Sequence, residues 1–99
     1  MNKAIQIDRK DNVATVTSDV QKGEPVDVLS PGGDVIGTFQ VPVSITLGHK
    51  LALSDLKMGE QVVKYGETIG VASKVIKTGE WVHTHNVESA AVPTSGYRG

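Results

Sequence analysis

The sequence predicts an all-β domain, on the strength of its valine content, its glycine-marked turns and its scarcity of helical periodicity. Valine occurs fifteen times and leucine five times in 99 residues, and β-branched side chains favour strands. Eleven glycines and four prolines divide the chain into short segments, as turns do in β proteins. The length predicts one domain with a single core. That core must be aliphatic, since only 4% of the residues are aromatic.

The first half of the chain predicts two hairpins. Residues 4–8 and 13–17 form strands of alternating or β-branched residues around a polar turn. Residues 25–29 and 35–41 form the next pair, separated by a turn rich in proline and glycine. Gly37 lies inside the last of these strands, where a glycine indicates a bulge or a close backbone approach.

The second half continues with shorter elements. Residues 42–47 are predicted to be extended, and residues 54–57 are the one place where a short helical turn fits the leucine spacing. Strands are then expected at 61–65, at 69–76 with Gly70 inside it, and at 81–87. The domain therefore spans 1–88. Residues 89–99, which are small and polar, are expected to be a flexible tail or the start of a linker.

An internal repeat supports this arrangement. Lys-x-Gly-Glu occurs at 57–60 and 77–80 and is approximated at 21–24, and a valine follows two residues after each Glu. The copies at 21–24 and 57–60 continue into Gly-x-x-Ile-Gly, at 33–37 and 66–70 respectively. The repeat predicts two similar bent hairpins that pack together with approximate symmetry, because glycine breaks allow strands to bend sharply.

Charge and composition exclude several classes of function. Ten basic and eleven acidic residues without a like-charged block disfavour a nucleic-acid binder. The absence of cysteine excludes a disulfide framework and a thiol nucleophile. No stretch reaches the roughly 18 apolar residues of a membrane span, and the amino terminus lacks the apolar run of a signal peptide. We therefore expect a cytoplasmic protein that binds neither membrane nor nucleic acid.

Candidate chemistry is concentrated at 81–87, Trp-Val-His-Thr-His-Asn-Val. In a strand, His83 and His85 share one face with Trp81, with their Cβ atoms roughly 7 Å apart. Two imidazoles at that spacing can hold a metal ion, with His49 as a third ligand, or can act in general acid–base catalysis without a metal. The alternative is a pair of solvated rings at a strand end. Trp81 is interpreted as a core or interface residue.

Three segments carry a resemblance to a known family: Gly-His-Lys-Leu-Ala-Leu at 48–53, Lys-Met-Gly-Glu-Gln-Val-Val-Lys-Tyr-Gly-Glu-Thr-Ile-Gly at 57–70, and Gly-Glu-Trp-Val-His-Thr-His-Asn-Val at 79–87. They strongly resemble the small N-terminal domain of the altronate and galactarate dehydratase family. A similar domain forms the separate alpha subunit of sulfolactate sulfo-lyase. The resemblance implies a SAF-type β-clip fold of bent hairpins with at most one short helical turn.

The resemblance also implies a function: elimination of water from a sugar acid or a related 2-hydroxy acid. It implies His83 and His85 as catalytic residues, His49, Lys50 and Asn86 as substrate-binding residues, and His83, His85 and His49 as metal candidates. The resemblance further implies Fe(II) or another divalent metal as cofactor, but only in the complete enzyme. Most of that active site would lie in a large catalytic subunit or domain, so this chain is not expected to be active alone.

Two alternatives remain beside this hypothesis. In the first, the chain is a non-catalytic module that binds a carbohydrate or acid or directs assembly. In the second, it is the alpha subunit of a sulfolactate sulfo-lyase. The sequence leaves open which acid is the substrate and whether the chain forms a homo-oligomer. It also leaves open whether the chain is a separately encoded subunit or the first domain of a longer enzyme.

Overall fold

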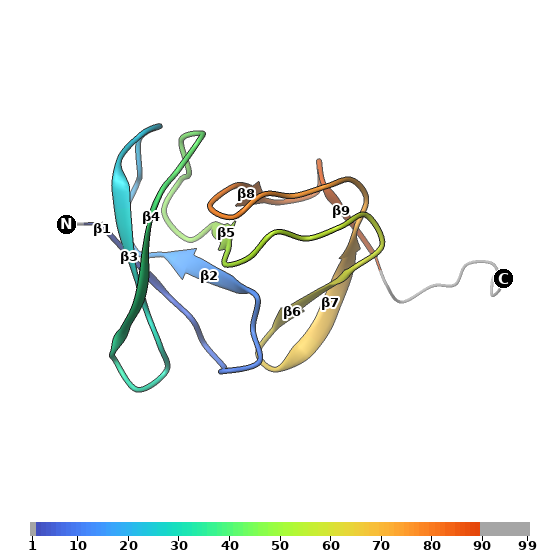
Figure 1. Ribbon diagram of the computed structural model, residues 1–99, viewed down its shortest axis with the longest axis horizontal. Coiled ribbons are helices and arrows are strands. Elements are labelled where there is room, and N and C mark those ends of the chain that lie inside the picture. The colour runs from blue at the N-terminus through green and yellow to red at the C-terminus, as the bar shows by residue number, and fades with distance from the viewer. Residues whose placement is uncertain (1, 90–99) are drawn as a thin grey trace, which may run out of the picture.

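The computed structural model describes residues 2–89, which contain nine strands and no helix (Figure 1). The all-β prediction is confirmed. The strands are β1 (Asn2–Ile5), β2 (Val13–Val16), β3 (Pro25–Leu29), β4 (Val35–Gln40), β5 (Lys50–Ala52), β6 (Gln61–Lys64), β7 (Glu67–Ala72), β8 (Trp81–Val82) and β9 (Val87–Glu88). They form a six-stranded sheet, in the order β4-β3-β1-β2-β5-β8, and a three-stranded sheet, β6-β7-β9. Having no helix, residues 2–89 also have none that could cross a membrane.

Two bent hairpins, β3–β4 and β6–β7, lie at opposite ends of the molecule (Figure 1). Each has a bulge beside its internal glycine. In the first, the register shifts between the pairs Val28–Gly37 and Leu29–Val35. In the second, it shifts in the same way next to Gly70, which pairs with Val62. The predicted repeat of two bent hairpins with internal glycines is therefore confirmed, but the prediction that the two hairpins pack together is wrong, because they belong to different sheets.

Four turns with the same sequence pattern and conformation connect the hairpins to the middle of the molecule. Each has a buried apolar residue, two further residues, a glycine with φ close to 90°, and then a polar residue. The four turns are 20–24, 45–49, 56–60 and 76–80. They associate in two pairs, through antiparallel bridges between Val20 and Ile45 and between Leu56 and Ile76. Positive φ explains why glycine recurs at this position. The Lys-x-Gly-Glu repeat identified three of these turns and missed the one at 45–49.

Several predicted elements differ from the structure, and the first strand, expected at 4–8, is Asn2–Ile5. The helical turn proposed for 54–57 is wrong, because Leu56 exchanges two backbone hydrogen bonds with Ile76, of 2.7 and 2.9 Å, and is thereby committed to a β bridge. Residues 42–47 contribute only the bridge residue Ile45. The strand expected at 69–76 ends at Ala72, after which the chain turns to bring Ile76 opposite Leu56.

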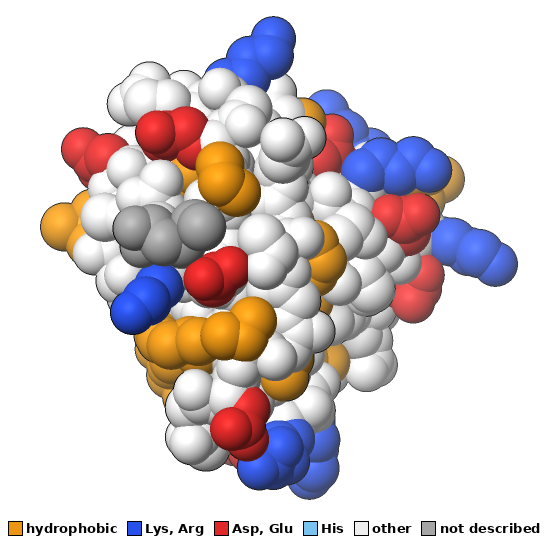
Figure 2. Space-filling model, turned by 60° about the vertical axis from the view of Figure 1, so that its left-hand side comes forward, with side chains coloured by type: hydrophobic (Ala, Val, Ile, Leu, Met, Phe, Trp, Pro, Cys, Tyr) orange, Lys and Arg blue, Asp and Glu red, His pale blue; other side chains and the backbone are white. Residues whose placement is uncertain are grey.

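The buried side chains form two clusters, where the sequence predicted one core. The first lies under β1–β5 and includes Val26, Val28 and Leu51; the second joins Val13 and Val82 to Val62 and Ile76. Every buried hydrophobic residue in the described region is Ala, Val, Ile or Leu, as the aliphatic composition predicted. Figure 2 brings the β3–β4 end forward, where hydrophobic and charged side chains are interspersed on the surface.

Candidate functional site

The pairing of β5 with β8 builds the candidate site. Lys50 lies opposite Val82, and Leu51 lies opposite Trp81. This register brings the end of the 45–49 turn beside the segment that contains Trp81 and His83, although the two are about thirty residues apart in the chain. The predicted site residues His49, Lys50 and His83 are thus neighbours because of tertiary strand pairing, which no local pattern encodes.

The segment 81–87 is not one strand, and this prediction is wrong. β8 ends at Val82, residues 83–86 form a tight turn, and β9 begins at Val87. The cause is Asn86, whose side-chain oxygen accepts the His83 N–H at 2.9 Å and whose amide NH₂ donates to the Trp81 carbonyl at 2.9 Å. Asn side chains that bond nearby backbone in this way favour turns over strands. Strict alternation of side chains across 81–87 therefore does not apply.

Asn86 is buried, with 3% of its surface exposed, and both ends of its amide are used by the turn. The carbonyl of His83 also accepts the backbone N–H groups of Asn86 and Val87, at 3.1 and 3.0 Å. Asn86 therefore stabilises the conformation of the loop that carries His83 and His85. The resemblance implied that Asn86 binds substrate. Because both ends of its amide are used by the turn, Asn86 would influence substrate binding through the shape of that loop.

Replacing Asn86 by alanine should lower the free energy of unfolding by about 1.5 kcal/mol, because two part-buried backbone groups lose their side-chain partner. Asn86→Asp should cost at least as much, because its carboxylate still accepts the His83 N–H but sets a buried negative charge against the Trp81 carbonyl oxygen, which is also an acceptor. Urea unfolding followed by the fluorescence of Trp81, the single tryptophan, measures both. Equal stability of Asn86→Ala and the wild type would contradict this role.

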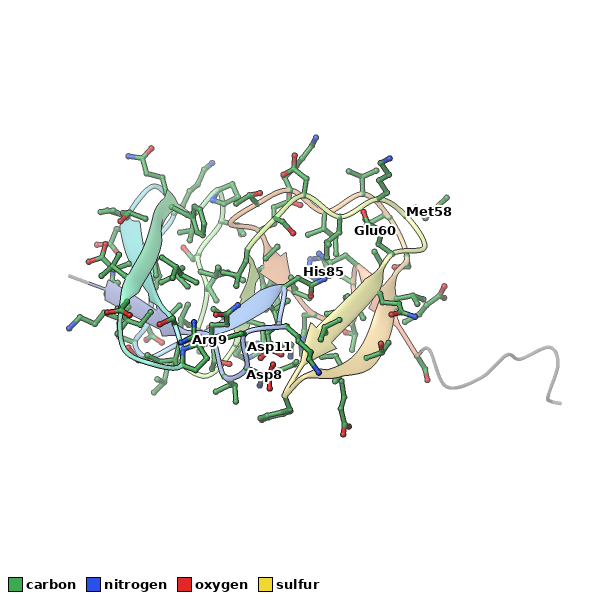
Figure 3. The ribbon with its side chains drawn as sticks, turned by 60° about the horizontal axis from the view of Figure 1, so that its bottom comes forward. Asp8, Arg9, Asp11, Met58, Glu60 and His85 are labelled. Carbon is green, nitrogen blue, oxygen red and sulfur yellow. The ribbon has the colours of Figure 1, made fainter. Side chains whose placement is uncertain are left out.

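Three imidazole rings gather around Trp81, and we call the four rings together the aromatic cluster: His49, Trp81, His83 and His85. The Trp81 ring stacks on His83, with centroids 5.3 Å apart and planes at 11°, and contacts His85 at 4.8 Å. His49 meets Trp81 edge-on at 5.6 Å and His83 at 5.1 Å. His83 and His85 are exposed, while Trp81 is half-buried and packs against the first core cluster. Figure 3 shows His85 near the middle of the molecule, between the two hairpins.

A pocket of about 320 Å³ adjoins the aromatic cluster. Its wall combines four aliphatic side chains with five polar or charged ones, and the lining residues are Lys50, Val62, Ile69, Val82, His83, Thr84, Val87, Glu88 and Ser89. Such a mixture of apolar wall and convergent polar groups is typical of small-molecule sites. His83 belongs both to the cluster and to this pocket, so an occupant of the pocket would contact one of the imidazoles.

Lys50 is the half-buried cation of the pocket. Burial lowers the pKa of its amino group, the positive charge of Lys64 lowers it further, and Tyr65 acts in the opposite direction. Lys64 itself lies over the Tyr65 ring, 4.7 Å from the centroid. A lysine that is partly desolvated and repelled by a second lysine gains from an anionic ligand, which restores a favourable partner for its charge. Lys50 is therefore placed to bind a carboxylate or a similar anion.

The three metal candidates come together as rings but not as a complete ligand set. In the part of the chain that the structure describes, no three His, Asp or Glu side chains are arranged to hold one metal ion. His49 Nδ1 already accepts a hydrogen bond of 3.2 Å from the indole N–H of Trp81. That leaves the imidazoles of His83 and His85, and two such ligands form only part of a tetrahedral or octahedral site.

Three participants in the site were not predicted from the sequence. Trp81, interpreted as a core or interface residue, does pack on the core but also contacts all three histidines. Lys64 and Tyr65 influence Lys50 from the tip of the β6–β7 hairpin. A turn was expected at Gly48 and His49, but it was not identified as a further copy of the repeat, although the apolar residue three positions before each turn glycine, as in Ile45 and Gly48, is a signal that would have shown it.

Comparison with known proteins agrees with the resemblance. Residues 2–90 match a family described as the altronate/galactarate dehydratase SAF domain. Altronate dehydratase of Bacillus subtilis is 37% identical over 89 residues, which are 90% of this chain and 17% of that enzyme. Galactarate dehydratase (L-threo-forming) of Escherichia coli is 32% identical over 78 residues, 79% of this chain and 14% of the enzyme. Subunit alpha of (2R)-sulfolactate sulfo-lyase from Chromohalobacter salexigens is 47% identical over 51 residues, 52% of this chain and 54% of the subunit.

The chain spans less than a fifth of the two dehydratases and about half of the sulfo-lyase subunit. The match to the SAF family covers all of the residues that the structure describes. The glycine-bent hairpins and the aromatic cluster both lie inside this region. The chain belongs to the altronate/galactarate dehydratase SAF domain family.

Proposed function

We propose that this chain is the small subunit or N-terminal domain of a sugar-acid hydro-lyase and contributes His83 and His85 to an active site shared with a large catalytic chain. The observation that carries the proposal is the gathering of three imidazoles beside a pocket that Lys50 lines. The short coverage of its dehydratase relatives supports a large partner, because most of each relative lies outside the matched region. The absence of cysteine is in keeping with a cytoplasmic location.

Dehydration of a 2-hydroxy acid needs three things from a site. An anchor must hold the carboxylate, a base must remove the proton from the carbon next to it, and an acid must protonate the neighbouring hydroxyl as it leaves as water. The enol that remains then becomes a 2-keto acid. Lys50 suits the first task as a point charge. His83, which lies in the pocket wall, suits proton transfer because imidazole exchanges protons near neutral pH.

A divalent metal such as Fe(II) is part of the proposal only for the complete enzyme. His83 and His85 would provide two of its ligands, and the large chain would provide the rest. When bound, the metal would supply Lewis-acid assistance to the departing hydroxyl. In that case Lys50 would still bind the carboxylate, and the large chain would have to supply the base, because the lone pairs of His83 and His85 would be used by the metal.

The test is turnover by the complex of this chain with the large chain that co-purifies with it. We expect conversion of altronate or galactarate, and we expect the double variant His83→Ala/His85→Ala to assemble normally but to turn over at least about 100-fold more slowly. Met58→Ala, at an exposed position in a different turn (Figure 3), is the matched control and should keep full activity. Near-normal turnover by the double variant would exclude a catalytic role for these histidines.

A second candidate function is that of a sulfo-lyase subunit, which the 47% identity to the alpha subunit favours. Elimination of sulfite in place of water would need the same carboxylate anchor and proton removal. Testing (2R)-sulfolactate beside altronate and galactarate, and measuring released sulfite, distinguishes the two functions.

A third candidate function, that of a non-catalytic module, predicts that this chain alone binds the acids. Calorimetry at millimolar ligand without a heat signal would exclude that version.

A further inference from the structure

The four glycine turns provide an internal comparison that singles out His49. In three of them, the residue after the glycine is glutamate: Glu24, Glu60 and Glu80. Each carboxylate accepts the backbone N–H of the residue three positions earlier, and all three bonds measure 2.7 Å. The glutamate therefore closes its own turn.

In the fourth turn this position is His49. Its backbone follows the same pattern, since the His49 N–H donates to the Thr46 carbonyl at 3.0 Å as the Glu24 N–H donates to Gln21 at 2.9 Å. Its side chain does something different. The ring turns toward Trp81, and Nδ1 accepts the indole N–H at 3.2 Å. The copy that departs from glutamate is thus the one whose side chain belongs to the aromatic cluster.

The Trp81 bond determines where His49 carries its proton. Indole Nε1 is only a donor, so Nδ1 must present a lone pair, and the neutral imidazole then has its hydrogen on Nε2. The opposite tautomer would set two N–H groups against each other. Trp81 is itself held in place, because it stacks on His83, contacts His85 and packs on the core. Its N–H therefore has a fixed direction.

We propose that Trp81 is a positioning residue that holds His49 with its proton on Nε2, and that His49 donates a hydrogen bond from this atom to an oxygen of the substrate. The inference rests on the proposed function and adds a specific donor to it. It also gives His49 a role different from metal ligation, because Nδ1 is occupied by the indole and Nε2 carries the hydrogen. A donor held in advance at the position of developing charge is an effective catalytic device.

The first arm of the test is spectroscopic and needs no turnover. In the ¹⁵N-labelled chain, at a pH where the ring is neutral, we expect a coupling across the hydrogen bond between Trp81 Nε1 and His49 Nδ1. We also expect a protonated Nε2. Trp81→Phe, which keeps an aromatic ring but loses the N–H, should leave a mixture of His49 tautomers. A protonated Nδ1 in the wild-type chain would overturn the proposal.

The second arm exchanges the repeat positions. His49→Glu restores the residue that the other three turns have, so the fold should be as stable as the wild type, while turnover by the complex should fall about 100-fold, as for loss of one such donor. His49→Gln, whose amide NH₂ can take the place of Nε2–H, should recover part of that loss. Glu60→His, the reverse exchange (Figure 3), should lower the thermal midpoint and leave turnover unchanged.

The outcomes are distinguishable. If the wild-type complex converts none of the acids, the proposed function fails, and with it the catalytic role of His49, whatever the spectra show. If the wild-type complex is active and the His49→Glu complex is equally active, the donor role of His49 is wrong and the proposed function stands. If His49→Glu unfolds the chain, His49 is a structural residue, and the proposal is wrong.

Discussion

Replacing Asp11 by alanine should lower the free energy of unfolding by about 3 kcal/mol, more than any other change of a polar side chain that we consider. Asp11 is 5% exposed, and its carboxylate accepts three backbone N–H groups: Asp8 at 2.9 Å, Tyr65 at 3.1 Å and Gly66 at 2.8 Å. Hydrogen bonds to a charged group are worth about 1.5–3 kcal/mol each, and losing the shared acceptor leaves several donors without partners.

The position of Asp11 explains why the effect should be large. Figure 3 shows Asp8 and Asp11 together in the loop after β1, and Tyr65 and Gly66 form the tip of the β6–β7 hairpin. Tyr65 adopts a φ of +59°, which is unfavourable for a residue with a side chain. Asp11 thus offsets that strain and joins the two sheets across more than fifty residues of sequence. It also fixes the hairpin tip whose Lys64 and Tyr65 influence Lys50.

Urea unfolding monitored by Trp81 fluorescence provides the measurement. Asp27→Ala is the matched control, because Asp27 accepts a single exposed bond from Thr38, at 2.7 Å, and should cost no more than about 0.5 kcal/mol. Comparable losses for the two variants would contradict the central role of Asp11. We further expect Asp11→Ala to change the chemical shifts of Lys50, because its charged neighbour would no longer be held.

The hairpins were predictable because their signals are local. Valine-rich segments bounded by glycine turns gave strands β2, β3, β4 and β6 nearly to the residue, and the two internal glycines correctly marked the bulges. Asp11 and Asn12 were interpreted only as polar turn residues. Their long-range bonds, such as Asn12 to Val63 at 2.8 Å, depend on which surfaces meet after folding, and no local pattern reports that.

The candidate site was predictable in its residues but not in its geometry. The resemblance pointed to His49, Lys50, His83 and His85, and the pairing of β5 with β8 does bring three of them together. The strand alternation behind the predicted histidine pair failed at Asn86, where a side chain competes with the sheet for backbone hydrogen bonds. Trp81 entered the site for a tertiary reason, since its partner His49 is 32 residues away.

Gly70→Ala should lower the free energy of unfolding by about 3 kcal/mol, and the equivalent change in the other hairpin should not. A Cβ atom at Gly70 would lie 2.6 Å from Val87 Cγ1 and 2.7 Å from the Glu88 carbonyl oxygen. The valine can rotate, but the carbonyl belongs to the backbone of β9, so the strand must move. Inserting one carbon into a site without space typically costs about 1–3 kcal/mol, and more when backbone has to shift.

Gly37 provides the matched control, because it has the same place in the repeat. Its added Cβ would meet only the end of the Phe39 ring, at 3.1 Å, which can swing aside, and alanine removes the entropic penalty of glycine within a strand. Gly37→Ala should therefore change stability by less than about 1 kcal/mol. Equal losses in the two variants would show that backbone conformation, and not the contact with β9, determines the need for glycine.

The consequence of Gly70→Ala should extend to the candidate site. β9 is two residues long and pairs with β7 through Val71–Glu88 and Ala72–Val87, and both of its residues line the pocket. Displacing it would also strain the 83–86 turn, whose Asn86 carbonyl accepts the Ser73 N–H at 2.9 Å. We therefore expect amide cross-peaks of residues 83–88 to shift in Gly70→Ala and to remain in place in Gly37→Ala. In the complex, only the first variant should lose turnover under conditions where both are folded, because the absence of a side chain at Gly70 keeps the histidine turn against the pocket.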